Sequence, residues 1–403
     1  MLRTCLGCRL TTKFSNAPPW PDNKLRRCQT VPDTIVIVLS YPSRSRDFKD
    51  RLRAALSNSR KDQMFRQPRP PLAIVILAGG TGGRMNSNCP KPLHNLAGAS
   101  LLRHALRTAE ALSPRRCVVV VSADAKDVAV AVRRLSPEVI IAVQPRACGT
   151  GNAALCGLSA LGGFEGRIVV LYADTPLTRP DTLRELIAAP GRVAVLGFDT
   201  PHPFRYGRLI RNEAGFLQRI VESGEASAAE AAVTLCNSGV MAFDASDARR
   251  WLPALSDDNS RREYFLTDVV SIARSEGKDC SVVLCEQDEA RGVNSRVELA
   301  EAEAAFQRRA RVEAMQSGVS MAAPETVFFS FDTKLGRDIT IGPNVVFAPG
   351  VTVEDDVEIS AFAYLADCVV RRGSLVEPIG RSSTAIPPSA HAAGTGGEGC
   401  SHF

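Results

Sequence analysis

The stretch "LAIVILAGGTGGRM", Leu72–Met85, decides the fold class. Its first six residues are all apolar, which predicts a strand buried on both faces. Four glycines follow within five positions, then Arg84, and Lys91 of "PKPL" comes soon after. Glycine lets backbone N–H groups approach an anion closely, and a helix beginning nearby would add its positive end. We therefore expect a triphosphate-binding loop flanked by two cations; the alternative, a plain strand-to-helix turn, does not need this composition.

The spacing of this loop excludes two common phosphate-binding motifs. A Walker A loop requires Gly-Lys followed by Ser or Thr, whereas Gly83 precedes Arg84 and Met85. A dinucleotide fingerprint that starts at Gly80 fails at Met85. The loop therefore matches neither of these two motifs, although the reasons that favour glycine beside an anion still apply.

Buried strands alternate with amphipathic helices after residue 71, which predicts an α/β domain with parallel strands covered on both faces. The apolar runs are 72–77, 117–121, 167–172 and 193–198, and the helix-like stretches are 100–112, 124–135 and 179–189. A ligand of such a sheet is expected at the carboxyl ends of the strands.

A six-residue period follows a long polar helix candidate at 296–316. From Leu335 the hexads read LGRDIT, IGPNVV, FAPGVT, VEDDVE, ISAFAY and LADCVV, each beginning with an aliphatic residue or Phe. This period predicts a parallel β-helix of two coils, with the register ending at Arg371. The Gly/Ser/Pro-rich tail has no apolar period, so we expect the β-helix to be truncated.

The charge is concentrated at the start of the chain. The net charge is +6, yet residues 1–70 contain 15 Lys and Arg against 5 Asp and Glu, and the remainder 34 against 38. The main body is therefore mildly acidic, which argues against nucleic acid as a partner. The first seventy residues lack periodicity and predict a disordered extension, with an organelle transit segment as the alternative.

The cysteines and hydropathy indicate a cytoplasmic protein without a membrane partner. Cys5 and Cys8 form one C-x-x-C, but Cys28 has no partner at zinc spacing, so a metal site there is not expected. The apolar run "TIVIVLS" is too short to span a bilayer.

The glycine loop resembles the signature of sugar-1-phosphate nucleotidyltransferases. Further segments narrow the resemblance to the N-acetylglucosamine-1-phosphate uridylyltransferase half of a bifunctional bacterial enzyme of cell-wall precursor synthesis. In family order these segments are "VQPRACGTGNA" (143–153), "LYADTPL" (171–177), "YGRLI" (206–210), "IVE" (220–222), "CNSGV" (236–240), "EYFLTD" (263–268) and "GVNSR" (292–296). The resemblance covers about residues 72–370.

The resemblance implies the fold and domain organisation. The fold class is α/β, a Rossmann-like nucleotide-diphospho-sugar transferase with a mostly parallel mixed sheet, followed by a short left-handed parallel β-helix stub. We expect a basic extension (1–70), the nucleotidyltransferase domain (71–297), a linker helix (298–334), a two-coil stub (335–370) and a disordered tail (371–403).

The resemblance also implies roles for individual residues. Leu77, Ala78, Gly79 and Gly80 would present backbone to the nucleotide, and Lys91 would meet its phosphates. Gln144, Gly149 and Thr150 would hold the uracil. Asp174 would bind Mg²⁺ with Asn294, after Tyr172 and Ala173 at a strand end. The amino-sugar would contact Gly207, Glu222 and Asn237, with Thr267 helping. We take Arg84, Lys91 and Asp174 as the catalytic residues.

Three of these roles have an ordinary structural alternative. Asp174 could be a helix N-cap, Asn237 a turn residue, and Glu222 a solvated loop charge. His94 follows "KPL", but we expect a surface or packing role, because attack by an already ionised phosphate needs no protein base.

The expected reaction joins UTP and N-acetylglucosamine-1-phosphate to give UDP-N-acetylglucosamine and pyrophosphate. The family's acetyltransferase half uses later β-helix coils, so acetyl transfer is not expected, and the family's trimer is in doubt. The alternatives are a nucleotidyltransferase that uses dTTP or another sugar, and an inactive product of a truncated gene. The loop departs from the family pattern at Gly79 and Gly83, which loosens it.

Overall fold

Strand β1 (Leu72–Leu77) lies in the interior of the main sheet in the computed structural model. Its parallel neighbours are β4 (Arg116–Ser122) on one side and β6 (Arg167–Tyr172) on the other. Ile74 and Ile76 are fully buried, and each such side chain contributes about 1.5–3 kcal/mol to folding. The carboxyl end of β1, where the glycine loop begins, is therefore fixed from both sides.

The main sheet has the order β11-β7-β10-β6-β1-β4-β5. Its other strands are β5 (Ile140–Gln144), β7 (Val193–Asp199), β10 (Leu235–Asp244) and β11 (Cys280–Cys285). β10 runs antiparallel between β6 and β7, while the remaining pairs on this path are parallel. The hairpin β8 (Arg208–Arg211) and β9 (Leu217–Val221) pairs with β10. The mostly parallel mixed sheet predicted from the sequence is confirmed.

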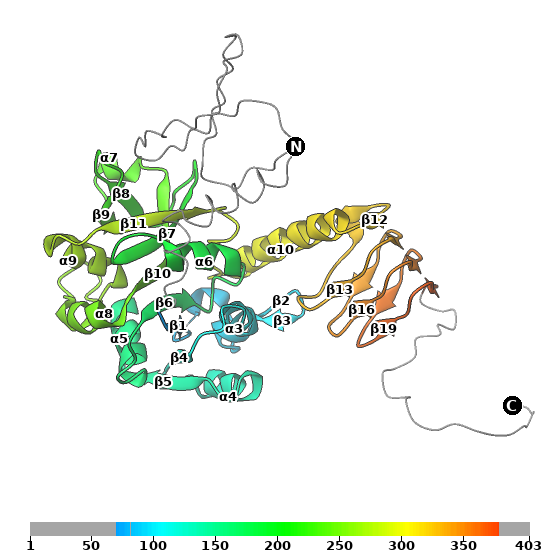
Figure 1. The fold of residues 1–403 in the computed structure, drawn as a ribbon, viewed down its shortest axis with the longest axis horizontal. Helices are drawn as coiled ribbons and strands as arrows, with labels where there is room; N and C mark the ends of the chain where they lie inside the picture. The colour runs from blue at the N-terminus through cyan, green and yellow to red at the C-terminus, as the bar shows by residue number, and fades with distance from the viewer. Residues whose placement is uncertain (1–69, 81, 379–403) are drawn as a thin grey trace, which may run out of the picture. The chain divides into compact units, whose positions relative to one another are not determined.

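Helices cover both faces of this sheet (Figure 1). Ala73, Val75 and Leu77 of β1 belong to one core cluster, which includes residues of α5 (Thr150–Ala160), α8 (Ala245–Trp251) and α9 (Val269–Ser275). Ile74 and Ile76 belong to a second cluster, with residues of α3 (Leu101–Glu110), α4 (Lys126–Leu135) and α6 (Pro180–Ala188). Successive residues of one strand therefore feed two cores, which explains the unbroken apolar run.

Helix α10 (Arg296–Gln316) leads from the sheet to a parallel β-helix (Figure 1). Its strands form three parallel ladders: β12 (Val319–Met321), β14 (Ile339–Ile341), β17 (Glu358–Ile359) and β20 (Leu375–Val376); β13 (Lys334–Leu335), β16 (Thr352–Val353) and β19 (Val369–Val370); and β15 (Val346–Phe347) with β18 (Tyr364–Leu365). Lys334 pairs with Thr352 and Val346 with Tyr364, so one coil contains three hexads.

The β-helix differs from the hexad prediction at both of its ends. β12 already pairs with β14, so parallel pairing begins before Leu335. The strict six-residue register ends just before Arg371, but parallel pairing continues beyond it. Thr352 pairs with Val369, which makes this coil one residue shorter, and β20 then pairs with β17. The shift buries Cys368 and Val370 in the core of the β-helix.

The first coil contacts the short hairpin of β2 (Asn95–Leu96) and β3 (Ala99–Ser100). Phe331 N donates to Ala97 O at 2.8 Å, and Ala97 N donates to Glu303 Oε2 of α10 at 2.6 Å. The hairpin follows directly on the turn that contains Lys91.

The structure describes residues 70–80 and 82–378. The predicted extension up to residue 69 and the predicted tail beyond residue 378 lie outside this range. Among the described helices, none combines the length and hydrophobicity needed to cross a membrane.

Candidate functional site

The glycine loop starts where β1 ends, between the ends of β4 and β6. Ala78 N donates to Val120 O at 2.8 Å, and Leu77 O accepts from Ala173 N at 3.0 Å. A Cβ on Gly79 would lie 3.3 Å from Ser122 N, and one on Gly82 would lie 2.8 Å from Lys91 Cβ. Because Gly82 also has a φ of 67°, the loop needs glycine for both conformation and space.

The helix expected beside this loop is absent from the described residues that follow it. Two 3-10 turns of three residues each, Gly83–Met85 and Lys91–Leu93, follow Gly82, and α3 does not begin until Leu101. Three residues cannot sum enough peptide dipoles to create a positive helix end. The expectation of a helix dipole at the loop was therefore wrong, which leaves the backbone N–H groups and the cations.

Lys91, Asp174 and Asn294 meet at one point, although they lie far apart in the sequence. The Lys91 ammonium forms an ion pair with Asp174 Oδ2, and it donates to Asn294 Oδ1 at 3.1 Å. Lys91 is 9% exposed, and a Cβ on Gly80 would lie 3.5 Å from its Nζ. Asp174 lies in a turn after β6, well before α6, so its alternative role as a helix N-cap is excluded.

The oxygens around Lys91 form a donor set that suits a hard divalent cation. Asp174 Oδ2 and Asn294 Oδ1 both face one cationic atom. Within the described residues, no group of three or more His, Cys, Asp and Glu is arranged to hold a metal. A site with two protein oxygens, completed by substrate phosphates and water, is the usual arrangement for Mg²⁺.

Gln144, at the end of β5, faces the glycine loop from the other side. Its side-chain amide donates to Gly149 O at 3.1 Å and to Asn152 Oδ1 at 3.0 Å. Gly149 has a φ of 99°, and a Cβ there would lie 2.6 Å from Tyr264 O. This position therefore requires glycine, and the segment before α5 is held close to Gln144.

Tyr172, at the end of β6, lies between the region around Gln144 and the neighbouring strand β10. Its hydroxyl lies near the side chain of Thr150, and burial raises its pKa well above the usual value. A Cβ on Gly239 would lie 2.9 Å from the Tyr172 ring. The Thr150 hydroxyl also accepts from Leu266 N at 3.1 Å. The neutral phenol therefore joins the α5 side of the site to the β10 side.

Asn237 and Gly207 lie next to each other on the β10 side of the site. Asn237 N donates to Gly207 O at 2.8 Å, and Asn237 Oδ1 accepts from Gly239 N at 2.9 Å within a strand irregularity. The turn role considered for Asn237 is therefore real. Because the carbonyl end of its side chain serves that turn, the NH₂ end remains the part suited to a ligand.

Glu222 lies just after β9 and is not a solvated loop charge. Thr267 Oγ1 donates to Glu222 Oε1 at 3.2 Å, and both residues are at least partly buried. Burial raises the pKa of Glu222. Burial and the neighbouring Glu222 raise the pKa of Asp268 in the same way. The β9 side is therefore lined by carboxyl and hydroxyl groups, which suit a polyhydroxylated ligand.

Two further predictions concern Arg84 and His94. Arg84 is exposed on the turn Gly83–Met85 and has no side-chain hydrogen bond or ion pair among residues 70–80 and 82–378. His94 is 6% exposed, and its Nδ1 faces the guanidinium of Arg296 at 3.2 Å. Burial and Arg296 lower its pKa. The geometry agrees with a packing role for His94. It also shows a contact made by Arg296, a residue that the sequence analysis did not single out although it lies in "GVNSR".

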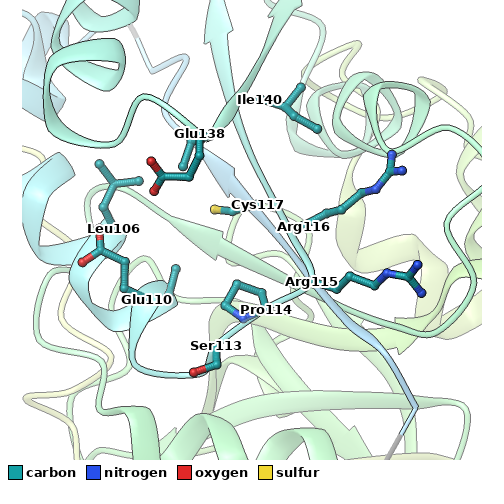
Figure 2. Close-up of a pocket in the computed structure, with 11 residues that line it drawn as sticks. Leu106, Glu110, Ser113, Pro114, Arg115, Arg116, Cys117, Glu138 and Ile140 are labelled. Carbon is teal, nitrogen blue, oxygen red and sulfur yellow. The ribbon is translucent and has the colours of Figure 1, made fainter.

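A separate hollow of about 390 Å³ lies at the other end of the strands (Figure 2). Glu110, Arg116, Cys117 and Glu138 line it where β4 and β5 begin. Burial raises the pKa of Cys117 to about 12, so its thiol stays protonated and unreactive. The hollow is remote from the carboxyl ends of the strands and does not belong to the site.

Comparisons with known proteins identify the family. A model of the MobA-like NTP transferase domain matches residues 74–231. The bifunctional protein GlmU of Paracoccus denitrificans is 48% identical over 311 residues, covering 77% of this chain and 70% of the relative. The bifunctional protein GlmU of Roseobacter denitrificans is 49% identical over 311 residues, with 77% and 69% covered. The chain belongs to the GlmU family.

Membership of the GlmU family confirms the recognition made from the sequence and makes the chain a nucleotidyltransferase. Nucleotidyltransferases of this kind typically use a divalent metal ion. The aligned part spans about 70% of the length of these GlmU relatives. Among solved structures, a nucleoside-diphosphate-sugar pyrophosphorylase from Vibrio cholerae RC9 gives a TM-score of 0.47 at 16% identity, covering 57% of this chain and 99% of that chain.

Proposed function

We propose that the chain is a uridylyltransferase that forms UDP-N-acetylglucosamine and pyrophosphate from UTP and N-acetylglucosamine-1-phosphate. The observation that carries the proposal is the meeting of Lys91, Asp174 and Asn294 beside the glycine loop. Gln144, proposed to bind the nucleobase, lies on one side of this point. Glu222 and Asn237, proposed to bind the sugar hydroxyls, lie on the other. Family membership supports uridylyl transfer as the activity.

The reaction needs positioning and charge compensation rather than a protein base. The nucleophile is a phosphate oxygen of the sugar phosphate, which is already ionised at neutral pH. It attacks the α-phosphorus of UTP in line, a P–O bond forms, and the bond to pyrophosphate breaks on the opposite side. Because the nucleophile carries no proton, the reaction gives His94 no task as a base. His94 is packed, and its pKa is lowered.

Main-chain N–H groups and cations would compensate the phosphate charge. The residues Leu77 to Gly80 would present backbone to the nucleotide, and Lys91 would bind its phosphates. Arg84, exposed beside the loop, would fork onto the α-phosphate and the departing pyrophosphate. The hydrogen bonds and ion pairs of these donors strengthen most at the oxygens where negative charge grows during transfer.

Asp174 and Asn294 would hold Mg²⁺. When bound, the ion would supply positive charge that compensates the phosphates of the two substrates. The protein contribution is to keep the two oxygens facing the same point. The backbone does this, since Val293 N donates to Asp174 O at 2.8 Å.

The two flanks of the site would select the base and the sugar. Gln144 has an amide that matches a pyrimidine edge, and Gly149 and Thr150 would enclose the uracil. Glu222 and Asn237 would bind the sugar hydroxyls and acetamido group, with Thr267 steadying Glu222. A related transferase for dTTP or another sugar phosphate would have the same phosphate-binding residues. The substrate selectivity therefore decides between the proposed function and this alternative.

A pyrophosphate-release assay with the full-length chain tests the proposal. We expect activity with UTP and N-acetylglucosamine-1-phosphate in the presence of Mg²⁺. Turnover with glucose-1-phosphate, or with dTTP in place of UTP, should be at least about tenfold slower, as expected when buried polar groups lose their partners. Equal or faster turnover with the substitutes would favour the alternative, and no pyrophosphate with any pair would refute the transferase.

Arg84→Ala should lower kcat more than it weakens UTP binding. A positioned donor that acts mainly on developing charge contributes about 10²-fold to kcat. Steady-state kinetics and calorimetric UTP binding measure the two effects separately. Arg115→Ala is a matched control, because Arg115 is also exposed but lines the remote hollow. Weaker UTP binding with unchanged kcat would make Arg84 a simple anchor.

A further inference from the structure

The segment between the main sheet and α10 contacts the loop that carries Asp174 and the side chain of Lys91. Val293 N donates to Asp174 O at 2.8 Å. Asn294 N donates to Glu298 Oε2 at 2.7 Å, and Ser295 Oγ caps the helix by accepting from Glu298 N at 3.2 Å. The backbone of Asn294 is therefore fixed on one side by the loop that carries Asp174 and on the other by the start of α10.

Arg296, in the first turn of α10, joins this segment to two further loops. Its Nε donates to Met85 O at 3.3 Å, and its NH1 group donates to His94 Nδ1 at 3.2 Å. Met85 ends the turn after the glycine loop, and His94 follows the turn that contains Lys91. Both partners are almost completely buried, so they are firm anchor points.

Residues 86–89, between these anchors, have few contacts of their own. All four are exposed, and Asn86 has a left-handed φ of 47°. The side-chain hydrogen bonds of this stretch are local, such as the bond from Cys89 N to Ser87 Oγ at 3.1 Å. The path from the glycine loop to Lys91 is therefore held mainly at its two ends, and Arg296 contacts both.

The Arg296–His94 contact is chemically selective. A guanidinium has only donors, so His94 Nδ1 must accept and the imidazole must be neutral. Burial and Arg296 itself lower the pKa of His94, in agreement with this requirement. The contact is thus a directed hydrogen bond that fixes the ring as well as the loop.

We propose that Arg296 is a positioning residue whose guanidinium fastens both ends of the glycine-loop-to-Lys91 segment to the backbone that carries Asn294. The phosphate-binding groups and the oxygen ligands then keep one fixed separation. This proposal rests on the proposed function, because it assigns Arg296 a task in that reaction. Nothing in it requires Arg296 to touch a substrate.

The test compares Arg296→Ala, Arg296→Lys and the control Arg308→Ala in the full-length chain. Arg308 lies on the same helix, is 59% exposed in its side chain and pairs with Asp288. Arg296→Ala should lower kcat about 10- to 100-fold, since a misplacement of about 1 Å can cost 10² in rate. The KM for the sugar phosphate should change less than about threefold, and Arg296→Lys should recover part of kcat, because one ammonium can replace one of the two donors.

Hydrogen exchange in the absence of substrates gives a second readout. Deuterium uptake of a peptide spanning residues 82–94 should rise in Arg296→Ala and stay at the wild-type level in Arg308→Ala. Unchanged kcat with unchanged uptake in Arg296→Ala would overturn the proposal. Increased uptake throughout the main sheet would also overturn it, because Arg296 would then support the whole fold.

The two proposals can fail separately. If the wild-type chain transfers no nucleotide to any sugar phosphate, the proposed function fails. In that case, local uptake at 82–94 still shows whether Arg296 fixes the segment. If the wild-type chain is active and Arg296→Ala equals the control in both readouts, only the positioning role is wrong.

Discussion

Asp174→Asn should reduce kcat by about 10²- to 10³-fold while the protein remains folded. Asparagine keeps the shape and one oxygen toward Lys91, but it removes the negative charge that would hold the divalent ion. The main-chain bond from Val293 N to Asp174 O is unaffected. A radiolabelled UTP transfer assay measures the loss, and thermal unfolding should show a decrease in Tm of only a few degrees, at about 2–4 °C per kcal/mol.

Asp181→Asn is the matched control for this result. Asp181 lies in the first turn of α6 with a side chain that is 90% exposed. It should retain wild-type turnover. Near-normal activity in Asp174→Asn would exclude Asp174 as a metal ligand. A collapse of Tm would show instead that the ion pair with Lys91 is mainly structural.

Lys91→Met should have an effect of similar size on kcat for a different reason. Methionine keeps most of the aliphatic length, but it removes the only ammonium beside Gly80 within residues 70–80 and 82–378. The growing charge on the phosphates then lacks a partner, and we expect a loss of about 10²-fold or more. The KM for UTP should also rise, since Lys91 would bind phosphate in the ground state as well.

Metal binding separates this role from a purely structural one. The ammonium of Lys91 contacts the same two oxygens that would hold the divalent ion. Without it, Mn²⁺ should bind the substrate-free variant at least as tightly as the wild type in a calorimetric titration. Lys126→Met, at an exposed position on α4, should behave like the wild type. Loss of Mn²⁺ binding in Lys91→Met would contradict the assignment.

The alternation of apolar runs and helix patterns predicted much of the main domain. β1 and β6 have the bounds of their apolar runs, and α10 spans 296–316 as expected. The hairpin β8–β9 and the pairing of β10 with both neighbours could not be predicted in this way, because strand order depends on contacts between distant segments. The one-residue register shift near Cys368 was also missed, since Val369 satisfies the hexad pattern equally well.

The candidate site was predicted in its residue types, and the structure supplied the contacts between them. Lys91 and Asn294 are 203 residues apart, so no local pattern could place them together. The resemblance named both, and they are in contact. Arg296 escaped notice because one of its partners is a main-chain carbonyl, which leaves no trace in the sequence.

The order of strands separates the residues proposed to bind the nucleobase from those proposed to bind the sugar. Gln144 belongs to β5 at one edge, Asn237 to β10 on the other side of β6, and Asp174 follows β6 between them. An engineer could therefore redesign the preference for the nucleobase without disturbing recognition of the acceptor, and the reverse. Substitutions that change the nucleobase preference and substitutions that change the sugar preference should then have additive effects when they are combined.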